Sequence, residues 1–173
     1  MRPLIVFLLF VQYCGVVPVN AAEDGIVWEE AVQMAKRGDA DFAFMYFRIL
    51  AHDYPDSRRA VDAQFALGEY YFLQGNFAVA AQEFGDFCAR YPKRKETLAA
   101  LGYLYQMARM QGQTDAMKKY RDRVVASHQV ILIFDEKQSF QFLSGFQRRH
   151  KVAFYIDKIE VWIDDKLFSE IPF

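Results

Sequence analysis

The chain has 173 residues, a formal net charge of −1, and a composition that is 53% hydrophobic and 17% aromatic. This charge argues against a nucleic-acid partner, because binding to phosphates requires an excess of clustered Lys and Arg. Seventeen Phe and ten Tyr residues argue against a disordered chain and predict a packed core or apolar grooves.

The first residues have the features of a secretory signal peptide. Arg2 precedes an apolar run from Leu4 to Val11, and small residues follow up to Ala22. We expect cleavage before Ala22, which assigns residues 1–21 to the signal peptide and predicts export, to the periplasm in a bacterium. An uncleaved membrane anchor is the alternative, but polar residues, Gly and Pro interrupt the run before the ~20 apolar residues that a span needs.

The two cysteines have different expected fates. A lipoprotein would be cut before Cys14 and acylated on it, but Tyr13 is bulky where such sites require a small residue, so lipidation is the less favoured alternative. If residues 1–21 are removed, Cys88 is the remaining thiol and no internal disulfide can form. The stability of the exported chain must then come from packing.

A pattern recurs after 37 residues in the following part of the chain. Its Gly, Ala, Phe, Tyr and Pro positions appear once in each of two consecutive units. The paired positions are Gly38 and Gly75, Ala43 and Ala80, Phe47 and Phe84, Tyr54 and Tyr91, and Pro55 and Pro92. A period of this size is typical of helix hairpins that bury their apolar faces by stacking on their neighbours, and such arrays usually bind partners.

The second unit has the pattern of two antiparallel helices. The segment from about Arg58 to Leu73 is apolar on more than one side, and apolar residues continue at helical spacing from Phe77 to Tyr91. A Gln74-Gly75-Asn76 turn joins the two, with Asn76 as the N-cap of the second helix. We expect Gly68 to permit a close approach of the helices.

These residues resemble the tetratricopeptide repeat (TPR) family. Five sites of the second unit are similar to its Leu-Gly, Tyr, Ala, Phe and Pro pattern at the family's spacing: Leu67-Gly68, Tyr71, Ala80, Phe84 and Pro92. The aromatic-rich ending from Phe84 to Pro92 resembles the exported bacterial subfamily. That subfamily includes the lipoprotein component of the outer-membrane β-barrel assembly machinery and the periplasmic coordinator of the Tol-Pal system.

The resemblance implies a mainly α fold, a short TPR-like α-solenoid of about three helix hairpins over residues 25–128. The first unit keeps Trp28 but lacks the family's Gly and Tyr, and the third has Leu101-Gly102 but no closing Pro before His128. Terminal repeats are expected to be atypical because one side faces solvent.

Beyond residue 129 the period becomes that of a strand. Ile159, Val161 and Ile163 alternate with polar or aromatic residues, and a turn at Asp164-Asp165-Lys166 predicts a hairpin with Leu167–Ile171. Residues 130–173 are therefore expected to form a small C-terminal β element. One interpretation is a cap on the exposed end of the array, and another is a strand-addition or self-association surface.

In TPR arrays the first helix of each pair lines a concave groove, and the resemblance implies the same for this chain. The expected groove residues are Asp62, Phe65, Glu69, Phe72, Leu73, Tyr103 and Gln106. Aromatic walls with a few carboxylates suit a peptide that carries apolar and basic side chains. Alternatively, Phe65 and Phe72 are covered by the β element or by the helix that carries Trp28.

No catalytic pattern is present in the sequence. His52, His128 and His150 have no metal-ligand spacing, and no nucleophile turn or phosphate loop occurs. We therefore expect no enzyme activity, no metal and no cofactor.

The leading hypothesis is an exported scaffold or adaptor that binds a protein or peptide in the cell envelope, with outer-membrane assembly as the setting that the resemblance suggests. Membrane association would come only through a partner or through an uncleaved or lipidated N-terminus. The alternative is a structural envelope protein that forms homo-oligomers through its β tail.

Overall fold

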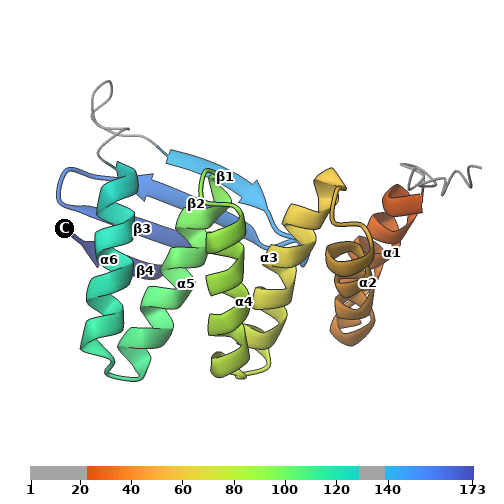
Figure 1. The fold of residues 1–173 in the computed structure, drawn as a ribbon, viewed down its shortest axis with the longest axis horizontal. Helices are drawn as coiled ribbons and strands as arrows, with labels where there is room; N and C mark the ends of the chain where they lie inside the picture. Colours follow the sequence, from red (N-terminus) through yellow and green to blue (C-terminus); the bar gives the residue numbers. More distant parts are fainter. Residues whose placement is uncertain (1–22, 129–138) are drawn as a thin grey trace, which may run out of the picture.

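The computed structural model describes residues 23–128 and 139–173, in which six helices precede a four-stranded sheet (Figure 1). The helices are α1 (Glu23–Arg37), α2 (Ala40–Asp53), α3 (Arg58–Leu73), α4 (Phe77–Arg90), α5 (Glu96–Met110) and α6 (Thr114–His128). The strands are β1 (Ser139–Leu143), β2 (Arg149–Phe154), β3 (Lys158–Ile163) and β4 (Lys166–Pro172). The predicted signal peptide, Cys14 and the start of the predicted β segment lie outside the described residues.

The three hairpins share one turn geometry. Gly38, Gly75 and Gly112 have φ angles of 85°, 73° and 66°, and each follows the first helix of its pair. This left-handed conformation costs glycine little and strains residues with a Cβ. The predicted TPR-like array of three hairpins, including its weaker first and third units, is confirmed.

Capping and small residues shape the central hairpin as expected. The Asn76 side chain accepts a hydrogen bond from the Val79 amide at 3.4 Å at the start of α4, and the Ser57 hydroxyl caps α3. A Cβ on Gly68 would lie 2.8 Å from the Phe84 ring, so α3 and α4 can pack this closely only around glycine.

The sheet is an antiparallel meander with the order β1-β2-β3-β4. The expected hairpin of β3 and β4 is present, and Asp164 and Asp165 turn it with φ angles of 51° and 63°. Sequence reasoning did not identify β1 and β2. Although β2 begins with the exposed Arg149, its second residue, His150, is fully buried.

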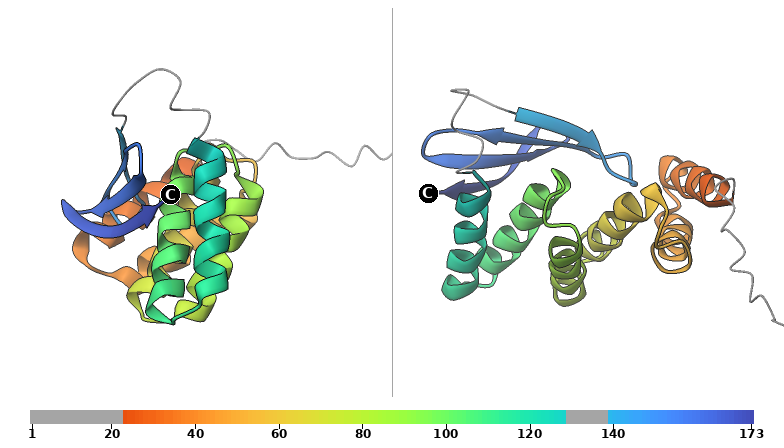
Figure 2. Two further views of the ribbon diagram at one scale, coloured as in Figure 1. Left: turned by 90° about the vertical axis from the view of Figure 1, so that its left-hand side faces the viewer. Right: turned by 45° about the horizontal axis from the view of Figure 1, so that its top comes forward.

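The sheet lies along one side of the helical array and does not cap its end (Figure 2). Its inner face carries buried apolar residues such as Val152, Val161 and Ile171, which join one core with α3, α4 and α5. The turn between β1 and β2 reaches the first hairpin, where the Phe146 ring contacts Phe47 at 5.3 Å between ring centroids. The small β element is confirmed, and it covers the side of the first helices α3 and α5.

We predict opposite effects for two glycine substitutions in helices. A Cβ on Gly102 of α5 would lie 2.7 Å from the Val161 side chain of β3, whereas a Cβ on Gly85 of α4 would meet no atom within 4 Å. Gly102→Ala should lower the free energy of unfolding by about 1–3 kcal/mol through overpacking. Gly85→Ala should raise it by about 0.5–1 kcal/mol through helix propensity. Urea denaturation measures both, and equal effects would contradict the tight docking of the sheet at Gly102.

Candidate functional site

The face that the sequence assigned to a groove is roofed by the protein's own sheet. Phe65 of α3 contacts Phe142 of β1 and His150 of β2 at centroid distances of 5.5 and 5.4 Å. The Phe168 ring of β4 packs on Phe72 at 5.5 Å and on Tyr103 of α5 at 4.7 Å. The structure therefore has the alternative arrangement, in which the β element covers Phe65 and Phe72 and no open groove forms around them.

The seven expected groove residues do not line one open surface. Phe65, Glu69 and Tyr103 are fully buried, Phe72 and Gln106 are partly buried, and Asp62 is partly exposed at one end of α3. Leu73, at the other end of α3, is 51% exposed. The reason is that α3 is apolar on more than one side, so it packs on its neighbouring helices and on the sheet. A role for Asp62, Leu73 or Gln106 in partner binding stays a prediction.

Three polar side chains meet beneath the sheet, one from each of α3, α5 and β2. The Tyr103 hydroxyl oxygen lies 3.3 Å from Glu69 Oε1 and 3.1 Å from His150 Nε2. His150 Nδ1 lies 3.2 Å from the Arg148 carbonyl oxygen, so Nδ1 donates and Nε2 accepts. The cluster thus joins two first helices to the sheet by hydrogen bonds within an aromatic core.

Burial disfavours the charged forms of the two titratable groups that contact Tyr103. Burial raises the pKa of Glu69 to about 7 and lowers the pKa of His150 to about 4. Both shifts have the same physical cause, because removal from water penalises the charged form of either group. The 3.4 Å separation of Glu69 Oε1 and His150 Nε2 is therefore a contact of neutral groups between about pH 4 and pH 7.

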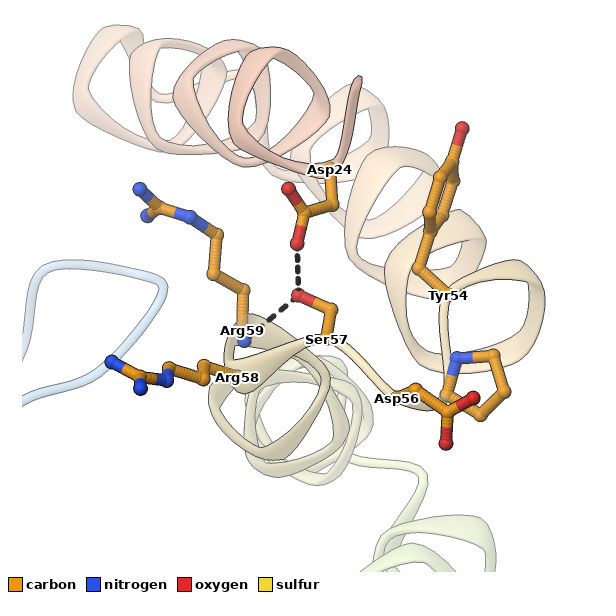
Figure 3. Close-up of a pocket in the computed structure, with 7 residues that line it drawn as sticks. Asp24, Tyr54, Asp56, Ser57, Arg58 and Arg59 are labelled. Carbon is orange, nitrogen blue, oxygen red and sulfur yellow. Dashed lines mark hydrogen bonds between the residues drawn. The ribbon is translucent and has the colours of Figure 1, made fainter. Parts of the chain in front are cut away.

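Two hollows open at the surface near the first turns of α3. The first has a volume of about 400 Å³ and lies between the starts of α1 and α3 and the end of α2 (Figure 3). It is lined by Asp24, Tyr54, Pro55, Asp56, Ser57, Arg58 and Arg59. The Ser57 hydroxyl donates a hydrogen bond to Asp24 and accepts one from the Arg59 amide, which ties α1 to the start of α3.

The second hollow has a volume of about 530 Å³ and includes the predicted groove residue Asp62. It is lined by Asp62, Lys93, Arg94, Lys95, Glu96, Phe142 and Leu143. Arg94 Nε lies 3.3 Å from the buried Glu96 carboxylate, and burial together with the charge of Glu96 raises the pKa of Asp62. Each hollow therefore presents charges of both signs beside an aromatic ring.

Metal binding and thiol chemistry have no support in the described residues. No cluster of three or more His, Cys, Asp or Glu side chains suited to a metal ion occurs among residues 23–128 and 139–173. Burial raises the pKa of the Cys88 thiol to about 11, which keeps it protonated and unreactive. Within these same residues, no helix combines the length and the apolar character that a membrane span requires.

Comparison with known protein families assigns the helical array to a family. Residues 20–144, more than half of the chain, match the family YfiO, which is described as an outer membrane lipoprotein. The chain belongs to the YfiO family. It is thus a TPR protein of the YfiO type, and its class is that of a protein-interaction scaffold in an outer-membrane lipoprotein context.

Other comparisons add little to the YfiO assignment. No curated protein matches the chain. A crystal structure of a variant of a Podospora anserina kinesin light chain with nearly identical TPR-like repeats is similar, with a TM-score of 0.48 and 17% sequence identity. The match covers 65% of this chain and 57% of the Podospora chain.

Sequence reasoning missed His150 and the arginines of the first hollow. The alternation of His150 and Val152 with the charged residues Arg149 and Lys151 was the available signal that His150 faces inward. For Arg58 and Arg59 no local signal existed, because the hollow forms only when α1, α2 and α3 come together.

We predict that Phe65 stabilises the fold and that Leu73 does not. Phe65→Ala should lower the free energy of unfolding by about 3–5 kcal/mol, because it removes a buried ring from the junction of α3 and the sheet. Leu73→Ala, on the exposed end of the same helix, should change it by about 0.5 kcal/mol or less. Chemical denaturation compares the two variants. A small loss for Phe65→Ala would contradict the roofed arrangement.

A pH series tests the uncharged cluster. Folded Glu69 holds its proton up to about pH 7 but loses it near pH 4.5 when unfolded, so Glu69 lowers stability as the pH rises through that range. Folded His150 stays neutral down to about pH 4 but gains a proton near pH 6.5 when unfolded, so His150 lowers stability as the pH falls through that range. Between pH 4.5 and 6.5 these two contributions oppose each other.

Glu69→Gln should leave only the contribution of His150. Relative to the wild-type protein, the free energy of unfolding of this variant should therefore rise by up to about 1.4 kcal/mol per pH unit from pH 4.5 to 6.5. Urea denaturation across this range gives the slope, and Glu30→Gln on the exposed side of α1 is the matched control. The same slope in both variants would contradict a neutral, buried Glu69.

Proposed function

We propose that this YfiO-family protein is an exported, non-catalytic scaffold that binds another protein in the cell envelope. The observation that carries the proposal is the YfiO match across the helical hairpins, since TPR hairpins are interaction modules. The aromatic side of α3 and α5 is already occupied by the sheet, so a partner must contact other surfaces. This geometry leaves the outer surfaces and the open hollows available to a partner.

The first turns of α3 are the best-supported contact region. Both hollows include residues of these turns, with Arg58 and Arg59 in one and Asp62 in the other. Each hollow combines basic and acidic side chains with an aromatic ring, which suits a protein segment with charges of both signs better than a uniformly anionic polymer. The partner is therefore proposed to be a peptide segment or loop of an envelope protein.

The alternative of self-assembly through the β tail has narrower support. Within the described sheet, β1 and β4 are edge strands, and an edge strand can pair with another chain. The apolar face of the sheet is already buried on the helices, however. Only the strand edges and the outer face remain for such assembly.

Membership of a lipoprotein family also bears on Cys14. The YfiO description favours lipid attachment at this cysteine over simple cleavage before Ala22, although the matched residues begin at 20, beyond Cys14. We propose attachment to a membrane through an acylated Cys14. The intact mass of the membrane-extracted protein distinguishes acylation at Cys14 from cleavage before Ala22.

Charge reversal tests the proposed contact region. Arg58→Glu in the first hollow and Lys93→Glu in the second each replace a positive charge by a negative one beside the carboxylates already there. Both side chains are exposed. The matched control, Lys118→Glu with Lys119→Glu on exposed positions of α6, changes the net charge equally. Recovery of a cross-linked partner from envelope extracts should fall at least about tenfold for the first pair only. Equal recovery with both pairs would remove the hollows from the proposal.

A further inference from the structure

One face of α2 exposes three large apolar side chains. Phe42, Met45 and Ile49 are 60%, 51% and 37% exposed. Their spacing of three and four residues places them in one stripe along the helix. The stripe belongs to the first hairpin, which lies beyond the end of the sheet (Figures 1 and 2).

Comparison of the repeats indicates that the hairpin itself does not need this stripe. The equivalent positions 37 residues later, on α4, are Val79, Gln82 and Asp86, and those on α6 are Ala116, Lys119 and Arg123. The outer positions of the second and third units are thus largely polar, while the hairpins keep the same fold. An apolar stripe at these positions of α2 indicates a contact outside the hairpin.

Charged residues along the stripe indicate what that contact is. At 100° per residue, Asp41 and Arg48 lie on the same side of the stripe, Asp41 near the start of α2 and Arg48 two turns later. Both are held at the surface. Asp41 accepts a hydrogen bond from the Tyr70 hydroxyl at 2.7 Å, and the Arg48 guanidinium lies 5.9 Å from the Phe44 ring centroid.

We propose that α2 packs antiparallel against α2 of a second copy of this chain, about a two-fold axis near Met45. In this register Phe42 of each copy meets Ile49 of the other, and the two Met45 side chains meet at the axis. The same register brings Asp41 of each copy to Arg48 of the other. A parallel pair would instead place the charged sides of the two helices on opposite sides of the contact, so the charge pattern selects the antiparallel, self-complementary arrangement.

The size and charge of the stripe set expectations for this dimer. One helix face buries less than the ~800 Å² per partner of a standard interface, so we expect a weak dimer with a dissociation constant on the order of micromolar.

A lipid surface is the less favoured occupant of the stripe. On the exposed face of α2 the carboxylates of Asp41 and Asp53 outnumber the Arg48 guanidinium, so anionic headgroups would on balance be repelled.

Sedimentation velocity of the purified protein over a range of concentrations tests the proposal. Met45→Glu should raise the dimer dissociation constant at least about tenfold, since it brings two carboxylates together at the axis. The matched control is Gln82→Glu at the equivalent exposed position of α4, which should leave the dimer intact. Circular dichroism and thermal melting verify that each variant is folded.

A charge swap provides a second test that does not depend on Met45. Asp41→Arg and Arg48→Asp should each weaken the dimer, and the double variant should restore it. A wild-type protein that stays monomeric at all concentrations, a dimer that persists in Met45→Glu, or a double variant without rescue would each overturn the proposal. Monomers that bind vesicles of anionic phospholipid through the stripe would also overturn it. These readouts use no envelope partner, so their failure is distinguishable from failure of the proposed scaffold function.

Discussion

The aromatic side of α3 and α5 has to be removed from water, and the rest of the structure depends on how this is done. Phe65 contacts rings from α4, α5, β1 and β2, including Phe84, Tyr103, Phe142 and His150. A peptide bound in an open TPR groove would leave these rings exposed whenever it dissociated. Here a sheet from the same chain covers them, so the hairpins and the sheet share one core.

This covering has consequences for charge and for recognition. Glu69 and His150 are both neutral between about pH 4 and pH 7 because both are excluded from water, and their hydrogen bonds with Tyr103 join helices to strands. The surfaces that we propose for partners therefore lie elsewhere, at the first turns of α3 and on the outer face of α2. These two surfaces differ in chemistry, since the first combines charges of both signs and the second is an apolar stripe.

The repeat was predictable because it depends on local chemistry. Glycine at the turns, Asn76 at a helix start and the small residue Gly68 act within one hairpin, and the same spacing recurs along the chain. The β3–β4 hairpin was predictable for the same reason. The strand β2 was not predictable, because near its start His150 lies between the charged residues Arg149 and Lys151. The burial of His150 depends on the packing of α3 and α5 beneath the sheet.

The sequence by itself determined the helix hairpins, their number and the presence of a β element, since periodicity and turn residues act between neighbours in the chain. Only the tertiary structure decided that the expected groove is closed, since the burial of Phe65 depends on a residue far along the chain, Phe142. The hollows at α3 and the exposed stripe of α2 were decided in the same way. Exposure is a property of the assembled chain, because a side chain's access to water depends on which distant elements pack over it.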